Sequence, residues 1–237
     1  MPDGLLLVAH GSRDPRAAAV AHEVAAAVEE QVDDLIAEAA FLELAEPDPP
    51  SALANLHRRG VGSVTILPFL LNHAYHSKTD LPGVATAARM RGLRVRLGSV
   101  LGPHDLILDA IVRQLTATGV AYDAVVLAAA GSTDPEANAT VAAVARALSD
   151  RQHVPVTPAY ASAAEPTVSD AVGRSYRAGA ARVAVVTYLL APGYFADAIR
   201  DWAEAEGAAA VTEPLGGSPE IVDVVVARLF EATSASS

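Results

Sequence analysis

The sequence predicts an α/β protein of two tandem domains, each with a parallel sheet covered by helices, related by internal duplication. Short aliphatic β-type runs alternate with longer segments of helical periodicity, a pattern typical of parallel sheets. The ten residues from Leu6 to Pro15 return from Val126 to Pro135 with the same Gly-Ser-x-Asp-Pro ending. The chain has 237 residues, of which 51% are hydrophobic, so each half can fill a core.

The duplication extends along both halves. Further pairs recur in the same order at a spacing of 119 residues: Glu46-Pro47 with Glu165-Pro166, Arg59-Gly60 with Ala178-Gly179, Leu70-Leu71 with Leu189-Leu190, and Tyr75-His76 with Tyr194-Phe195. Leu101-Gly102 and Leu215-Gly216 each precede a closing apolar helix. Because so many matches in one order indicate a repeat, we expect domains at 1–120 and 121–237.

The elements of the first half follow from the alternation of apolar runs and helical patterns. Strands are expected at 4–9, 38–44, 63–69 and 94–100, and helices at 16–33, 50–60, 80–91 and 105–118. The first helix has a strong start signal, because Ser12 and Asp14 offer N-cap oxygens and Pro15 needs no N–H in the first turn.

The second half repeats the same order of elements. Strands are expected at 124–129, 155–161, 182–189 and 208–213, and helices at 136–149, 166–178, 195–206 and 219–232. Ser132, Asp134 and Pro135 repeat the helix start of the first half.

A four-stranded unit of this kind has the strand order 2-1-3-4, which makes each domain flavodoxin-like. Ligands of open parallel sheets bind beyond the carboxyl ends of the strands, where the order reverses, here between strands 1 and 3. His10 directly follows the first strand and His76 lies in the segment after the third. Glu43 is expected at the end of the neighbouring second strand. These three side chains are therefore predicted to converge on one crevice.

Comparison of the halves separates residues of the fold from residues of a site. The pairs Gly11/Gly131, Ser12/Ser132, Asp14/Asp134 and Glu46/Glu165 persist, and we interpret them as turn and capping residues. The three crevice candidates are lost, since the second half has Ala130 for His10, Phe195 for His76 and Ser162 for Glu43. The sequence thus predicts one active site in the first half, with the second half supplying a wall of its cleft.

Composition excludes several classes of function. The absence of cysteine excludes disulfides, zinc–thiolate sites, iron–sulfur clusters and cysteine nucleophiles. A net charge of −11 has the wrong sign for nucleic-acid binding. No apolar run reaches the ~18–20 residues of a membrane span, and the start of the chain lacks the basic segment of a signal peptide. We expect a soluble, cytoplasmic protein with no nucleic-acid or membrane partner.

Four stretches cover most of the first half: LLLVAHGSRDP, FLELAEP, PFLLNHAYHSKTDLP and LGPHD. Together they resemble the sirohydrochlorin chelatase family, the class II chelatases. The two-lobed length matches the long form of that family, so the resemblance implies chelatase-like domains. It also implies insertion of Co²⁺ or Fe²⁺ into sirohydrochlorin, on the path to cobalamin or siroheme, without an organic cofactor. Asn72-His73 departs from the small residues expected there, which leaves open whether His73 reaches the metal.

Insertion chemistry needs weak metal ligands and a base for two pyrrole protons. Imidazole suits Co²⁺, Fe²⁺ and Ni²⁺ and titrates near neutral pH, so we assign His10 and His76 as metal ligands and proton acceptors, with the two roles left undivided. Glu43 would complete a two-His, one-carboxylate set or guide the ion. Because a ligating histidine must be neutral, activity is expected to fall as the pH drops through roughly 6–7.

The substrate that the resemblance implies carries many carboxylates, which an acidic protein must hold with local basic groups. Arg13 and Arg16 beside the first crevice loop, and Lys78 beside His76, are the candidates. Tyr75 is a candidate to stack on the macrocycle.

Other interpretations of the same residues remain open. His10 and Glu43 could serve only local hydrogen bonding or face solvent. A non-catalytic metal or tetrapyrrole carrier could use the same two histidines. A phosphohistidine enzyme would need an arginine just before the histidine, where this chain has Ala9. Because a fused duplicate already provides two lobes, we expect a monomer that acts as a pseudo-dimer.

Overall fold

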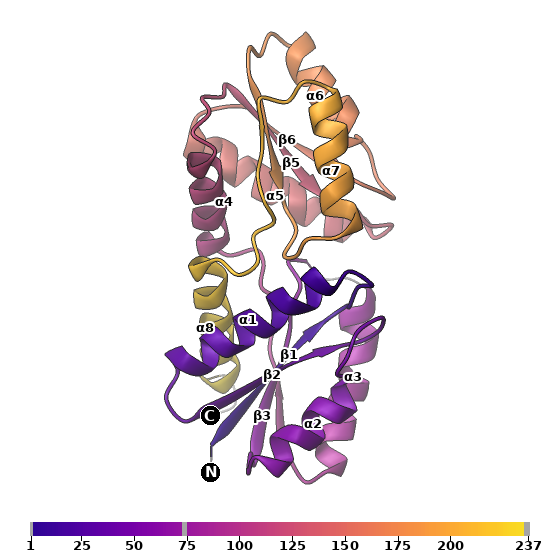
Figure 1. The fold of residues 1–237 in the computed structure, drawn as a ribbon, viewed down its shortest axis with the longest axis vertical. Helices are drawn as coiled ribbons and strands as arrows, with labels where there is room; N and C mark the ends of the chain where they lie inside the picture. The colour runs from indigo at the N-terminus through magenta and orange to yellow at the C-terminus, as the bar shows by residue number, and fades with distance from the viewer. Residues whose placement is uncertain (1, 73–74, 235–237) are drawn as a thin grey trace. The chain divides into compact units, whose positions relative to one another are not determined.

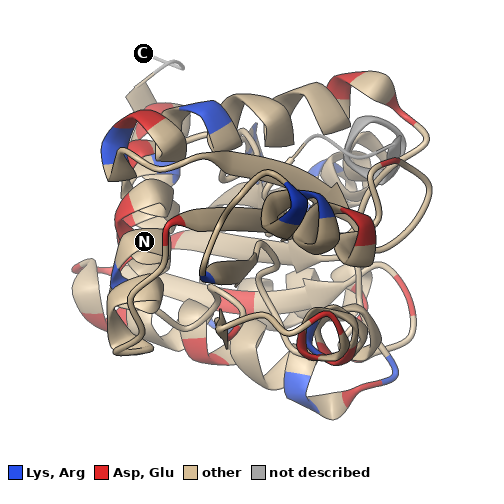
Figure 2. Ribbon diagram, turned by 90° about the horizontal axis from the view of Figure 1, so that it is seen from above, with Lys and Arg blue, Asp and Glu red and all other residues tan. Residues whose placement is uncertain are grey.

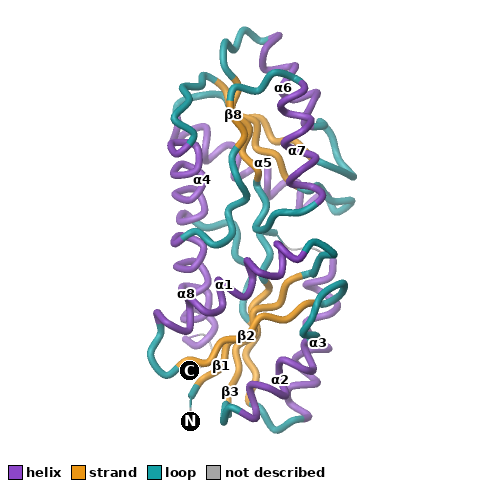
Figure 3. The backbone as a smooth tube through the Cα atoms, viewed as in Figure 1, coloured by secondary structure: helices purple, strands orange, loops and turns teal. Residues whose placement is uncertain are grey.

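The computed structural model describes residues 2–72 and 75–234, without the side chains of residues 75–80. The chain forms two four-stranded parallel sheets with flanking helices, as Figure 3 shows in orange and purple. The strand orders are β2-β1-β3-β4 and β6-β5-β7-β8, so the predicted fold class and the predicted 2-1-3-4 order are confirmed in both sheets.

The elements follow one another in strict strand–helix alternation (Figure 1). Those of the first repeat are β1 (Asp3–Ala9), α1 (Pro15–Gln31), β2 (Leu35–Phe41), α2 (Pro49–Arg58), β3 (Ser63–Pro68), α3 (Tyr75–Met90), β4 (Arg94–Leu97) and α4 (Asp105–Ala117). Those of the second repeat are β5 (Ala124–Ala129), α5 (Pro135–Gln152), β6 (Val156–Tyr160), α6 (Val168–Arg177), β7 (Val183–Thr187), α7 (Tyr194–Ala205), β8 (Ala210–Val211) and α8 (Pro219–Ser234).

Two elements of the first repeat lie elsewhere than predicted. β2 begins and ends three residues earlier than the expected 38–44, because the chain leaves the sheet after Phe41, whose N–H bonds to the Pro47 carbonyl. The alternation around Glu43 continues the strand pattern, although the backbone there forms a loop with Leu44 at a φ of 62°. α3 begins at Tyr75 instead of residue 80, with Pro82 inside the helix.

The helix starts that repeat between the halves are confirmed. Asp14 caps α1 by accepting a hydrogen bond from the Arg16 N–H, and Asp134 caps α5 through the Glu136 N–H in the same way. Bonding to the Arg16 side chain, with this backbone bond, also holds the pKa of Asp14 below its ordinary value. Glu46 accepts from the Asp48 N–H and Glu165 from the Thr167 N–H, which agrees with the capping interpretation of that pair.

The chain divides into two compact units that exchange their last helices. Unit 1 comprises the residues up to His104 together with those from Gly216 onward, and unit 2 comprises Asp105–Leu215. The helix α8, which ends the second repeat, therefore packs in unit 1, and α4, which ends the first repeat, packs in unit 2. The domain boundary expected near residue 120 refers to the sequence duplication and stays a prediction. The two compact units have different limits, because each includes the last helix of the other repeat.

Each sheet is covered on both faces. In unit 1, α2 and α3 bury one face in a core that includes Leu53, Ile66 and Ala85, while α1 and α8 pack against each other and the sheet on the other side. In unit 2, α6 and α7 cover one face and α4 and α5 lie against the sheet and each other. This enclosure explains why the central strands β1, β3, β5 and β7 are almost continuously buried and mostly apolar.

Charged residues lie mainly on the outer faces of the helices and in loops, as Figure 2 shows with acidic residues in red and basic residues in blue. Within residues 2–72 and 75–234, no helix has the length and apolar character that a membrane crossing needs.

Candidate functional site

His10 and Glu43 meet at the carboxyl ends of β1 and β2. The Nε2 atom of His10 lies 2.9 Å from Oε1 of Glu43, and the two side chains are 45% and 54% exposed. An ionised carboxylate can only accept, so the Nε2 atom of a neutral His10 carries the hydrogen of this bond and the ring lone pair is on Nδ1. The pair is therefore accessible from solvent and has the tautomer of the imidazole fixed by a carboxylate.

The backbone brings Glu43 to His10 although Glu43 is not on a strand. The prediction placed it at the end of the second strand, and it lies two residues beyond β2. Its N–H bonds to the His10 carbonyl at 3.0 Å, and the Leu42 N–H bonds to the Ala9 carbonyl at 3.1 Å. These two bonds continue the ladder between β1 and β2 past the strand ends. The predicted convergence of His10 and Glu43 thus arises from loop pairing, a contact that the sequence pattern did not reveal.

The other predicted partners fall outside what the structure describes. α3 includes the positions of Tyr75, His76 and Lys78 in its first turn, but their side chains lie outside the described residues. His73 lies outside them entirely. The assignment of His76 as the second imidazole therefore stays a prediction. Among the residues with described side chains, no group of three or more His, Asp or Glu is arranged to hold a metal ion.

The two arginines beside the first crevice loop differ in their surroundings. Arg16 forms a close ion pair with Asp14, with Nη2 at 2.6 Å and Nε at 3.0 Å from the same carboxylate oxygen. Two guanidinium nitrogens of Arg16 thus bond to the helix cap, which disfavours Arg16 relative to Arg13 as a substrate anchor. Arg13 is exposed and lies three residues after His10. Its side chain forms no ion pair or hydrogen bond with the residues that the structure describes.

The second repeat has the same backbone contacts but lacks the imidazole and the carboxylate of the candidate site. The Ser162 N–H bonds to the Ala130 carbonyl at 2.9 Å, as the Glu43 N–H does to His10, and the Ser162 hydroxyl donates to that same carbonyl. Ala130 has no side chain that could bind an ion. Phe195, which replaces His76, is 38% exposed and contacts Tyr194 edge to face at 5.6 Å. The second repeat thus has no imidazole and no carboxylate at the three positions of the candidate site.

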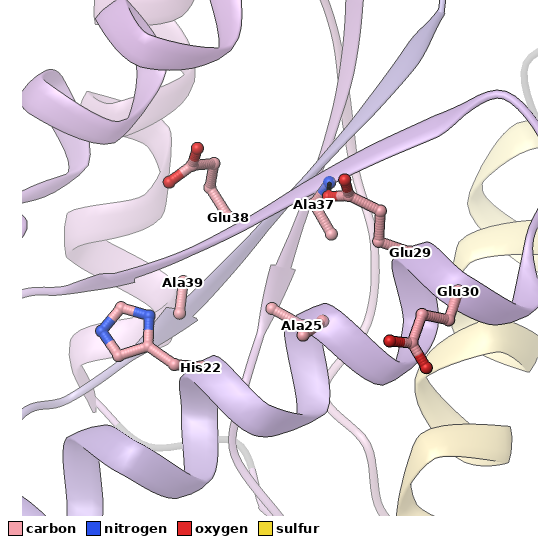
Figure 4. Close-up of a pocket in the computed structure, with 8 residues that line it drawn as sticks. His22, Ala25, Glu29, Glu30, Ala37, Glu38 and Ala39 are labelled. Atoms are coloured by element: carbon pink, nitrogen blue, oxygen red, sulfur yellow. Dashed lines mark hydrogen bonds between the residues drawn. The ribbon is translucent and has the colours of Figure 1, made fainter.

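A separate pocket of about 270 Å³ lies between α1 and the edge strand β2 (Figure 4). Its walls carry His22, Glu29 and Glu30 from α1, together with Ala37 and Ala39 from the strand. Glu29 is already engaged, because it accepts from the Ala37 N–H and pairs with Arg59, so it covers the open edge of the sheet. None of the predicted site residues lines this pocket.

Comparison with known proteins gives a consistent result over both repeats. The CbiX family model matches residues 4–118 and 124–232. The chain is 28% identical over 198 residues to a sirohydrochlorin ferrochelatase of Bacillus subtilis, covering 81% of this chain and 76% of that protein. It is 25% identical over 199 residues to a sirohydrochlorin cobaltochelatase of Priestia megaterium, covering 80% of this chain and 64% of that protein.

Among solved structures, SirB from Bacillus subtilis with Fe³⁺ has a TM-score of 0.86 at 25% sequence identity. The match covers 100% of this chain and 97% of that chain, so both units have counterparts there.

Proposed function

This chain belongs to the CbiX family, and on that premise we propose that it is a sirohydrochlorin chelatase, a lyase that inserts Co²⁺ or Fe²⁺ into the ring. The observation that carries the proposal is the His10–Glu43 bond of 2.9 Å, present in the first of two repeats whose backbones are otherwise alike. Relatives named for iron and for cobalt insertion support both metals as substrates.

His10 and Glu43 act together in the proposed reaction. Insertion replaces two pyrrole protons of the ring by one divalent metal ion, so two protons must leave. The lone pair on Nδ1 of His10 either holds the incoming ion or accepts one of these protons, and Glu43 stabilises the imidazolium that proton uptake creates. His76 is proposed as the second imidazole, which takes the role that His10 does not. The imidazole that acts as the base passes the first proton to water and then accepts the second, so both pyrrole protons leave the ring.

An ion held by few protein atoms suits this task. The ring nitrogens must displace the protein ligands, and a closed four-ligand site would retain the metal instead. The exposure of the His10–Glu43 pair supports such a partial site, because water can complete the coordination until the ring arrives. Three further points stay predictions: activity without an organic cofactor, a cytoplasmic location and the monomeric state.

The proposal is tested by turnover. Purified protein is mixed anaerobically with excess sirohydrochlorin and either Co²⁺ or Fe²⁺, and the absorbance change of the ring is followed against a protein-free reaction. A chelatase converts many equivalents of ring per protein. A metal or tetrapyrrole carrier, the competing interpretation, changes the spectrum of one equivalent at most, and that result would overturn the proposed function.

Arg13 is proposed to bind a substrate carboxylate. We expect Arg13→Ala to raise the KM for sirohydrochlorin about 5-fold with little change in kcat, since an exposed charge-assisted bond contributes roughly 1 kcal/mol. The difference should shrink at high salt because the pair is screened. Steady-state kinetics at two ionic strengths measure both effects.

Arg16→Ala is the matched control for that measurement. Its guanidinium is held by Asp14, so we expect a change in KM below about 2-fold. A fall in kcat for Arg13→Ala at unchanged KM would contradict a role in substrate binding.

A further inference from the structure

The loop that carries Glu43 lies directly against the backbone of Gly11. Gly11 has a φ of 102°, a region that residues with a Cβ rarely adopt. A Cβ at this position would overlap the carbonyl oxygen of Glu43. The backbone bonds from Glu43 to His10 and from Leu42 to Ala9 hold the loop at this close approach. Neither side of the contact is a flexible side chain that could move away.

We propose that Gly11 is a positioning residue, which sets the distance between the Glu43 carboxylate and the His10 imidazole. The inference rests on the proposed function for its catalytic consequence. A Cβ at residue 11 has to push the Glu43 carbonyl outward by a distance on the order of 1 Å or more to reach ordinary van der Waals separation. A hydrogen bond of 2.9 Å does not survive such a displacement in good geometry.

The second repeat supplies the matched comparison within the same molecule. Gly131 has a φ of 85°, and a Cβ there would overlap the carbonyl oxygen of Ser162. The Ser162 N–H bonds to the Ala130 carbonyl as the Glu43 N–H bonds to His10. The steric arrangement is therefore repeated, although no imidazole–carboxylate bond depends on it. A purely architectural role would make the two glycines equivalent in every measurement.

The test compares Gly11→Ala with Gly131→Ala. Both should lower the Tm, because both force the same backbone conflict. We expect Gly11→Ala to lower the rate of metal insertion per folded protein by at least 10-fold, since a misplacement of about 1 Å can cost as much as 10²-fold. Gly131→Ala should stay within 2-fold of the parent rate. Equal losses in the two variants, or an undiminished rate in Gly11→Ala, would overturn the proposal.

A double-mutant cycle asks whether Gly11 acts through Glu43. In the Glu43→Ala background, Gly11→Ala should cost less than about 3-fold further in rate, because the bond it disturbs is already gone. A further 10-fold loss would assign Gly11 a different role. Glu43→Asp shortens the carboxylate reach without touching residue 11, and it should reproduce the loss even if Gly11→Ala does not fold.

A readout that does not need turnover separates this proposal from the proposed function. The imidazole ¹⁵N signals of His10, identified by their absence in His10→Ala, report the bond to Glu43. They should shift in Gly11→Ala as they do in Glu43→Ala and stay unchanged in Gly131→Ala. Unshifted signals in Gly11→Ala would overturn the positioning role, whether or not the protein inserts metal.

Discussion

His10→Ala should reduce the catalysed rate of metal insertion by at least about 10²-fold. The substitution removes the imidazole nitrogen that holds the ion or accepts a proton, and either loss is of this size. The Glu43 carboxylate is 54% exposed and can be solvated when the imidazole is gone, so the fold should not suffer. The measurement is the initial rate of the absorbance change of sirohydrochlorin with Co²⁺, under anaerobic conditions, together with the Tm of each protein.

His57→Ala is the control for that prediction. His57 is an exposed histidine in the last turn of α2, which leads into the amino end of β3 and so lies away from the carboxyl ends of the strands. Its replacement should change neither the rate nor the Tm appreciably. His153 is a poorer control, because it has a φ of 55° at the end of α5 and alanine would be strained there. If His10→Ala retained more than a tenth of the parent rate, the candidate site would be in the wrong place.

The position of His10 could be predicted from sequence because it depends on a general property of parallel sheets. A polar residue directly after an apolar first strand lies at the carboxyl end of the sheet, whichever strands flank it. The repeat then showed which polar residues the fold does not require, since Ala130 and Ser162 replace His10 and Glu43 on the same backbone. The strand order 2-1-3-4 completed the argument and is confirmed in both sheets.

The contacts of the loops could not be predicted in the same way. Leu42, Glu43 and Leu44 alternate as a strand does, and only the positive φ of Leu44 shows that the chain turns away there. Gly11 was interpreted as a turn residue, and its contact with the Glu43 carbonyl was missed. The signal was present in the sequence as the recurring Gly131, but a repeated glycine does not reveal which carbonyl approaches it.

The exchange of the last helices, α4 and α8, between the two units also could not be predicted from the sequence. An amphipathic helix such as α4 or α8 shows which of its faces is buried, but not which sheet it covers. In unit 1, α8 packs on α1, β3 and β4. Arg228 on α8 reaches the carbonyl oxygens of Leu101 and Pro103 at 3.0 and 3.1 Å, in the segment that follows β4. A single side chain from the end of the chain thus satisfies backbone groups more than a hundred residues away.

Arg228→Ala should therefore destabilise the protein by about 2 kcal/mol. A hydrogen bond from a charged group is worth about 1.5–3 kcal/mol, and the carbonyl of Leu101, a fully buried residue, would lose this donor. The expected loss of stability is smaller than the sum of two such bonds. The Nε atom of Arg228 is buried without a partner in the described structure, and the substitution removes that unfavourable burial. A loss of this size lowers the Tm by roughly 4–8 °C, which calorimetry measures directly.

Arg200→Ala shows whether the effect belongs to the backbone contacts. Arg200 on α7 forms ion pairs with Glu213 and Glu204, whose side chains are 74% and 60% exposed. Arg200→Ala therefore removes an arginine from ion pairs that are solvated. Such a pair contributes at most about 1 kcal/mol, and the Tm should fall by less than half as much as for Arg228→Ala. Both carbonyls accept from Nη2 of Arg228, so Arg228→Lys keeps the charge and a nitrogen with several N–H donors, but on a shorter side chain, and its Tm should lie between the two. If Arg228→Ala and Arg200→Ala lowered the Tm equally, the binding of the Leu101 segment by α8 would contribute nothing beyond an ordinary surface charge.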